Sequence, residues 1–323
     1  MLHLRVITPT ERSQEVIDLL SNEPAVAHLI VVPGAGRRPE GDVVLCDVVR
    51  EGASEVLDRL RALGVDRTGA IAMETVEVAL SEAAHKAAHA VPGLGVDAVV
   101  WDEIEQRTGE ETRLSVAYLV FLTVATVLAG IGVLLDQPIL IVGAMVVGPE
   151  FGPLAALCVG IVRRRASMVR RSVLALAVGF PIAMLVTIIT TWAMTATGLV
   201  SREMLLGPRP ISGFIWRPDA LSWIVAFLAG VAGMLSLTSA KSGALIGVVI
   251  SVTTVPAAAN AAVALAYGVR HEAVGSAVQF LVNVAAIVVA GVATLLIQRL
   301  WWRRRPRRTP TAMVVKRVGA ADR

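Results

Sequence analysis

The chain has 323 residues, of which 55% are hydrophobic and 17% charged. Its mean hydropathy of +0.69 excludes an ordinary soluble globular protein. Residues 1–113 carry 20 acidic against 11 basic side chains, whereas the remainder carries 6 against 19. The high pI of about 9.6 therefore belongs to the apolar part of the chain, where it indicates a membrane surface rather than nucleic acid.

The first 80 residues have the pattern of a small α+β domain. Strand-like and helix-like runs alternate over residues 2–8, 10–22, 27–33, 42–50, 53–63 and 70–79. Their order, βαββαβ, predicts a ferredoxin-like domain over residues 1–80. Residues 1–20 contain charges throughout and no apolar run, so we expect no signal peptide and place this domain in the cytoplasm.

A connector is predicted over residues 81–113. It contains a turn at Pro92–Gly95 and then an amphipathic helix, expected to lie on the membrane surface or against a partner subunit. His85 and His89 have the spacing of helical metal ligands. Without a Cys or carboxylate at ligand spacing, however, a solvated helix face is favoured, and no metal site is predicted.

Six apolar segments predict a six-span membrane domain over residues 114–300, because each has about the 20 residues that cross a bilayer. They are 114–135, 139–162, 169–197, 221–240, 243–268 and 274–298. Arginines cluster at 163–171 and in the basic tail, residues 301–323. In the tail the arginine run begins at residue 303. Positive charge favours the inside, so both termini are predicted in the cytoplasm of a plasma (inner) membrane. The tail is interpreted as an anchor on anionic lipid.

The second apolar segment is interrupted in its middle by Gly148–Pro153, which contains Glu150. Such a break survives in a bilayer only when it is packed in protein or lines a polar cavity. An acid at that depth is a functional-site hypothesis by default. One alternative stays open, namely that Glu150 only caps the helix that follows.

An internal repeat is suggested when the sequence is shifted by 107 residues, because Pro149 then falls on Pro256. Three spans per copy would make a 3+3 inverted repeat, whose two broken spans approach each other. The candidate substrate- or ion-binding residues come from these two broken segments, with Asn283 added from the last span. They are Glu150, Pro149, Gly152, Thr253, Thr254, Asn260 and Asn283.

The run from Ile141 to Leu154, IVGAMVVGPEFGPL, resembles the signature of domain-of-unknown-function family 389, a family of uncharacterised hydrophobic prokaryotic membrane proteins. The resemblance extends to the segment Val100–Glu105 and to Asn283. It implies a multi-span membrane protein and names no substrate or reaction.

No HExxH, Walker loop, CxxC pair or Ser/His/Asp grouping is visible in the sequence, so we do not expect an enzyme. The leading expectation is a small-solute or ion transporter with a cytoplasmic regulatory domain. The alternative is a membrane-anchored sensor or scaffold whose soluble domain binds a ligand or partner. The expected partners are the lipid bilayer, anionic lipid at the tail and a possible second copy of the chain, without nucleic acid. The cofactor is left unspecified.

Overall fold

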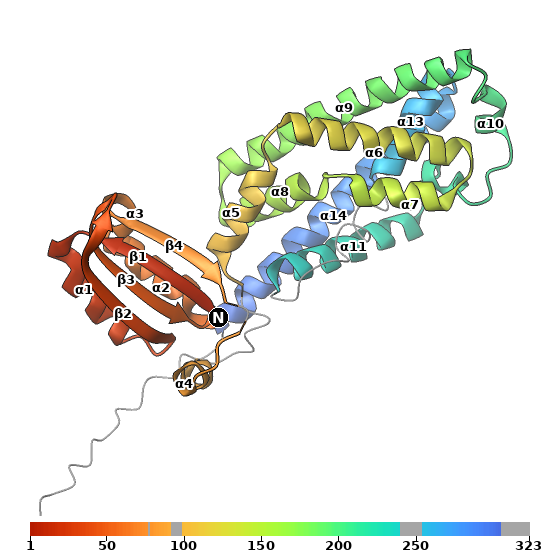
Figure 1. Ribbon diagram of the computed structural model, residues 1–323. Coiled ribbons are helices and arrows are strands. Elements are labelled where there is room, and N and C mark those ends of the chain that lie inside the picture. Colours follow the sequence, from red (N-terminus) through yellow and green to blue (C-terminus); the bar gives the residue numbers. More distant parts are fainter. Residues whose placement is uncertain (77, 92–98, 240–253, 305–323) are drawn as a thin grey trace, which may run out of the picture. The chain divides into compact units, whose positions relative to one another are not determined.

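The computed structural model describes residues 1–76, 78–91, 99–239 and 254–304 (Figure 1). Residues 1–100 form one compact unit and residues 101–300 form another. The predicted connector therefore divides between them: its first helix belongs to the first unit and its second helix to the second unit.

The first unit is built on a four-stranded antiparallel sheet in the order β2-β3-β1-β4. In chain order its elements are β1 (Leu2–Thr8), α1 (Thr10–Ser21), β2 (Val26–Arg37), β3 (Glu40–Val48), α2 (Arg50–Ala62), α3 (Val65–Thr68), β4 (Ala70–Thr75) and α4 (Glu82–Ala90). Alternate residues of β1, such as Leu4, are fully buried, and they share one core with Val16 of α1 and Val56 of α2.

Two bounds in this unit differ from the sequence prediction. The stretch 34–41, which separates the runs predicted at 27–33 and 42–50, is mostly paired strand rather than a turn, because Gly36 and Arg37 lie opposite Gly41 and Glu40. The last strand ends at Thr75 rather than at residue 79. Glycine and proline favour turns locally, but the cross-strand hydrogen bonds of a long hairpin override that preference here.

The second unit is helical (Figure 1). Its elements are α5 (Trp101–Glu111), α6 (Val116–Leu134), α7 (Pro138–Val147), α8 (Phe151–Arg163), α9 (Ala166–Ala196), α10 (Arg202–Leu206), η2 (Gly213–Trp216), α11 (Ala220–Thr238), α13 (Val255–Ala266) and α14 (Arg270–Arg304). Among the described residues, α6, α9, α11 and α14 are long and apolar enough to cross a membrane. The pair α7 and α8 is a further candidate span, bent by 53° at its break.

The predicted spans agree with these helices except at 243–268. Residues 240–253 lie outside the described residues, and α13 is a shorter apolar helix. The number of six spans therefore stays a prediction. The break in the predicted second span is present, between Val147 and Phe151.

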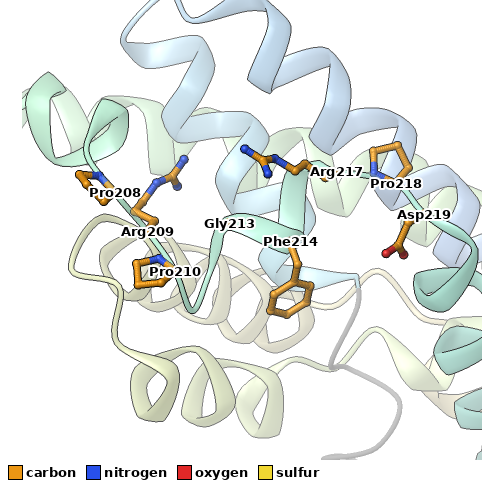
Figure 2. Close-up of a pocket in the computed structure, with 8 residues that line it drawn as sticks. All are labelled: Pro208, Arg209, Pro210, Gly213, Phe214, Arg217, Pro218 and Asp219. Carbon is orange, nitrogen blue, oxygen red and sulfur yellow. The ribbon is translucent and has the colours of Figure 1, made fainter.

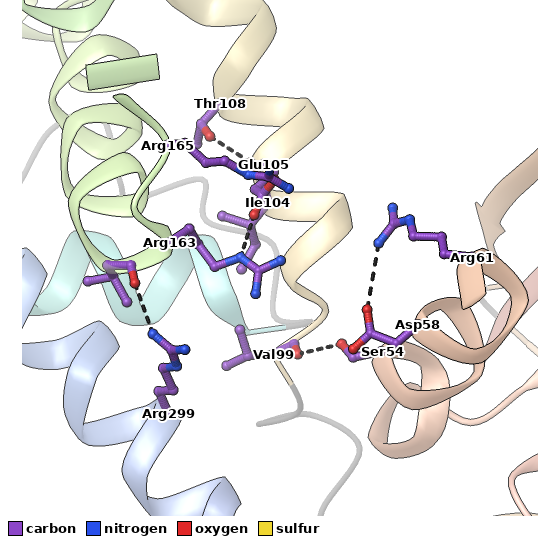
Figure 3. Close-up of polar contacts among 11 residues, drawn as sticks. Ser54, Asp58, Arg61, Val99, Ile104, Glu105, Thr108, Arg163, Arg165 and Arg299 are labelled. Atoms are coloured by element: carbon purple, nitrogen blue, oxygen red, sulfur yellow. Dashed lines mark hydrogen bonds and ion pairs between the residues drawn. The ribbon is translucent and has the colours of Figure 1, made fainter. Parts of the chain in front are cut away.

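Helix α5 packs on α8 of the same chain. Glu105 pairs with Arg163 and, at 3.4 Å, with Arg165 (Figure 3), and the Arg163 guanidinium lies 5.6 Å from the centre of the Trp101 ring. The amphipathic face of α5 thus meets a helix of its own chain, because the basic end of α8 complements its acids.

The helices recur at a constant offset. Helices α6, α8 and α9 begin at Val116, Phe151 and Ala166. Helices α11, α13 and α14 each begin 104 positions later, at Ala220, Val255 and Arg270. Every buried residue of α11 lies 104 positions after a buried residue of α6.

The ends of α8 and α13 recur as well. Arg164 and Gly268, which follow these helices, have left-handed φ values of 57° and 71°. The helix starts therefore give an offset of 104 residues, whereas the sequence suggested a shift of 107, and the repeat itself stays a prediction.

Candidate functional site

Glu150 lies at the break between α7 and α8, immediately before the first residue of α8. Its side chain is 0% exposed. One carboxylate oxygen, Oε1, accepts a hydrogen bond of 3.0 Å from Thr254 Oγ1, and the other, Oε2, has no hydrogen-bond partner among the described residues. The side chain makes no capping hydrogen bond to α8, so the capping alternative lacks the contact that it requires.

Gly148 makes room for this carboxylate. A Cβ at residue 148 would lie 2.3 Å from Glu150 Oε2 and 3.1 Å from Val255 Cγ2. Pro149, half-buried between them, has no amide hydrogen and so cannot continue the α7 hydrogen-bond ladder. The sequence Gly-Pro-Glu therefore ends one helix and leaves space for an acid at the turn.

Thr254 stands in the same relation to α13 as Glu150 does to α8, since each immediately precedes its helix. The N-terminus of a helix carries a partial positive charge. The carboxylate thus lies where two helix N-termini meet, an arrangement that favours a buried negative charge. This contact joins residues of the two broken segments, as the sequence predicted for Glu150 and Thr254.

A pocket of about 250 Å³ reaches the beginning of α13 at Pro256. It is lined by Phe214, Ile215, Asp219, Leu221, Ser222, Val225, Pro256, Gln279 and Asn283. Gln279 Nε2 donates to Asn283 Oδ1 at 3.0 Å, whereas Gln279 Oε1 is buried with no partner among the described residues. A mainly apolar pocket with a few converging polar groups is typical of a small-molecule site. Asn283 thus lines a pocket, and its role in binding stays a prediction.

Asn260 joins a different cluster. Its Oδ1 accepts from Arg209 Nη1 at 3.1 Å, and its Nδ2 donates to Glu272 Oε1 at 3.1 Å and to Ser276 Oγ at 2.7 Å. Arg209 also pairs with Glu272, and their side chains are only 6% and 3% exposed. The sequence analysis missed this ion pair. Polar residues at helical spacing along α14 (272, 276, 279 and 283) were the signal that could have found it.

Two further candidates are placed elsewhere. Gly152 packs against α5, where a Cβ would lie 2.3 Å from Glu111 Oε2. Thr253 lies outside the described residues. The predicted set is thus divided among the Glu150–Thr254 contact, the pocket at Asn283, the Asn260 cluster and the α5 contact.

The first unit contains a polar chain that the sequence analysis also missed. Asp47 binds His3 Nδ1 at 2.8 Å and His28 Nδ1 at 2.7 Å, and His28 Nε2 lies 2.5 Å from Ser81 Oγ. The four residues are far apart in the sequence, which hid the grouping. Ser81 Oγ also accepts a hydrogen bond of 3.0 Å from Ala84 N and so caps α4. These hydrogen bonds therefore connect α4 to the sheet.

The apolar helices, the broken pair and the buried acid are those of a multi-span helical membrane protein that carries an N-terminal antiparallel sheet unit. Residues 145–289 match a family described as Domain of unknown function (DUF389), which confirms the resemblance carried by the Ile141–Leu154 run. An uncharacterised protein of Methanocaldococcus jannaschii is 24% identical over 221 residues, covering 67% of this chain and 66% of that protein. No solved structure matches the chain.

Proposed function

We propose that the protein transports a small solute or ion and that Glu150 is the residue on which transport depends. The observation that carries the proposal is the buried carboxylate oxygen without a partner among the described residues, at the meeting point of α8 and α13. A charge at mid-membrane costs roughly 2.5–3.5 kcal/mol on insertion scales. An acid retained there is explained by a proton or cation that it takes up and releases.

The recurrence at 104 residues supports an inverted repeat. Three crossings in the first copy, α6, α7/α8 and α9, would turn the second copy over in the membrane, and transporter sites commonly lie between two discontinuous helices of such repeats. Six spans are part of this proposal. The element order and the strand order β2-β3-β1-β4 likewise support a ferredoxin-like fold for the first unit.

The two halves differ in packing, which supports alternating access. The pocket residues Ser222, Gln279 and Asn283 correspond, at the offset of 104, to Tyr118, Ala175 and Gly179. Those three are tightly packed: a Cβ at residue 179 would lie 2.8 Å from Tyr118 Cε1. One half is therefore open where the other is closed, and exchanging the two packings would move the opening to the opposite side.

Helix α5 is the proposed link to the regulatory domain. It begins the second unit in the sequence, and its Glu111 lies against Gly152, two residues from Glu150. Movement of α5 would change the packing at the start of α8, next to the buried acid.

The test is solute permeation into proteoliposomes, followed by light scattering during osmotic swelling, which needs no labelled substrate. The wild type should accelerate swelling with at least one small solute, and Glu150→Gln should abolish that acceleration because Gln keeps the shape but cannot carry a proton. Glu203→Gln, at an exposed residue of α10, is the matched control. Equal rates for the Glu150→Gln variant and the wild type would reject the proposal. No permeation of any solute would favour the sensor or scaffold alternative.

We also propose that both termini lie in the cytoplasm of the plasma membrane. Three arginines at the junction of α8 and α9 support this orientation by the positive-inside rule: Arg163, which ends α8, and Arg164 and Arg165, which follow it. Reporter fusions after Ser167 and after Pro210 should report opposite sides of the membrane. Two reporters on the same side would reject the six-span topology.

A further inference from the structure

A second pocket, of about 650 Å³, lies on the segment between α10 and α11 (Figure 2). Its lining includes two arginines, Arg209 and Arg217, among prolines and Gly213. Figure 2 shows the guanidinium ends of the two side chains pointing toward one another. Nothing in the transport proposal uses these arginines.

Two of the three nitrogens of the Arg209 guanidinium have partners among the described residues. Its Nη1 donates to Asn260 and its Nη2 pairs with Glu272, whereas Nε is buried and has no hydrogen-bond partner among the described residues. A buried N–H donor that stays unpaired is costly. Because Nε is buried, an oxyanion acceptor in the pocket would satisfy it only after the Arg209 side chain shifts toward the pocket. The guanidinium and oxyanion geometries would then match.

Glu272 neutralises the charge of Arg209, so the net positive charge of the pocket comes from Arg217. Arg217 is exposed, and its guanidinium lies 4.7 Å from the centre of the Trp216 ring, which orients the side chain. The acid in the lining, Asp219, accepts from Ser222 N at 2.7 Å as the cap of α11, and its carboxylate points away from the arginines in Figure 2. The arginine side of the pocket therefore favours an anion.

We propose that this pocket binds a small oxyanion, a carboxylate or a phosphate, between Arg209 and Arg217. The pocket shares Phe214 and Asp219 with the 250 Å³ pocket that reaches Pro256. The oxyanion site thus adjoins the pocket that reaches Pro256. Its role as the substrate-selecting site rests on the proposed function, whereas the binding of an oxyanion does not.

The experiment measures binding of inorganic phosphate and of succinate to the full-length protein in a non-ionic detergent, by thermal shift and calorimetry. We expect saturable binding of at least one of them, and Arg217→Gln should weaken it about tenfold or more. Arg202→Gln, at an exposed arginine of α10, should bind like the wild type. Arg209→Lys keeps a positive charge beside Glu272 but loses Nε, so it should also weaken binding while the protein stays folded.

Absence of binding by both anions, or equal binding by the Arg217→Gln variant and the wild type, would overturn the proposal. Repeating the titration in nanodiscs of phosphatidylglycerol separates the two sources of phosphate. If Arg217-dependent binding of free phosphate persists there, the ligand is a soluble anion; if it is lost, a lipid headgroup occupies the site. The Glu150→Gln variant should bind phosphate like the wild type, so failure of transport and failure of this site give different results.

Discussion

Thr254 donates its hydroxyl to Glu150 Oε1 over 3.0 Å, and the two residues, 104 positions apart, occupy the same place in the two halves of the helical unit. Each immediately precedes a helix, α8 for Glu150 and α13 for Thr254. A hydrogen bond between corresponding residues is what a local two-fold axis through the site would produce. The carboxylate and the hydroxyl differ in chemistry, so the two halves supply an acid and its hydrogen-bond donor.

Gly148→Ala tests the space around the Glu150 carboxylate. The backbone at residue 148 has φ −66° and ψ 126°, which alanine adopts freely, so the change is opposed by side-chain contacts, chiefly the one 2.3 Å from Glu150 Oε2 and also the one 3.1 Å from Val255 Cγ2. We expect lower thermal stability and slower permeation, because the carboxylate must move away from Thr254. Gly143→Ala, where the added Cβ meets nothing within 4 Å, should leave both properties intact. Equal behaviour of the two variants would contradict this account of Gly148.

Glu105→Gln tests the docking of α5 on α8. Glu105 is the acid that meets both Arg163 and Arg165, and a hydrogen bond to a charged group contributes about 1.5–3 kcal/mol. We expect faster hydrogen exchange of the α5 amides in the full-length protein. Glu110→Gln, at an exposed position of the same helix, is the control and should exchange like the wild type. Unchanged protection in the Glu105→Gln variant would show that apolar contacts alone hold α5.

A fragment of residues 1–100 should fold independently. The core of the first unit extends beyond residue 80, because it includes Ala87 and Val100. Cooperative urea unfolding of the fragment is the expected result. Leu4→Ala should destabilise it by about 2–5 kcal/mol, since this side chain is fully buried, and Val32→Ala, at a residue 40% exposed, by much less. A fragment without cooperative unfolding would show that the unit depends on the rest of the chain.

Asp47→Asn should change how the stability of this fragment depends on pH. Burial by itself raises the pKa of the Asp47 carboxyl, but hydrogen bonds from His28 and His3 and their charges outweigh burial, so the pKa is lowered. The stabilisation from a lowered carboxyl pKa is present above the unfolded value of about 3.9 and is lost as the pH falls through the folded pKa. The variant should be less stable at neutral pH and lose less on acidification. Asp66→Asn, at an exposed residue, should follow the wild type.

Local sequence features were sufficient for the elements that depend on local forces. Apolar length predicted α6, α9, α11 and α14, because crossing a bilayer is set by the number of consecutive apolar residues. The pair Gly148-Pro149 predicted the break before Glu150, because proline removes a backbone donor wherever it stands. Strand-like runs of residues predicted the strands of the first unit, because strand formation also depends on local backbone geometry.

Contacts between distant residues were decided only by the tertiary structure. Arg209 has two partners, Asn260 and Glu272, which lie 51 and 63 positions away in the sequence. Neither spacing is set by a helix or strand period. Packing of α5 on α8 likewise depends on which faces meet. Composition predicted a membrane protein, and the position of Glu150 within an apolar segment singled out this acid, since burial of charge is costly in any fold. Only the packing of the helices showed that Thr254 is the partner of Glu150 and that corresponding helices begin 104 residues apart. Side chains at equivalent depths can pair in many registers until the positions of the helix ends are known.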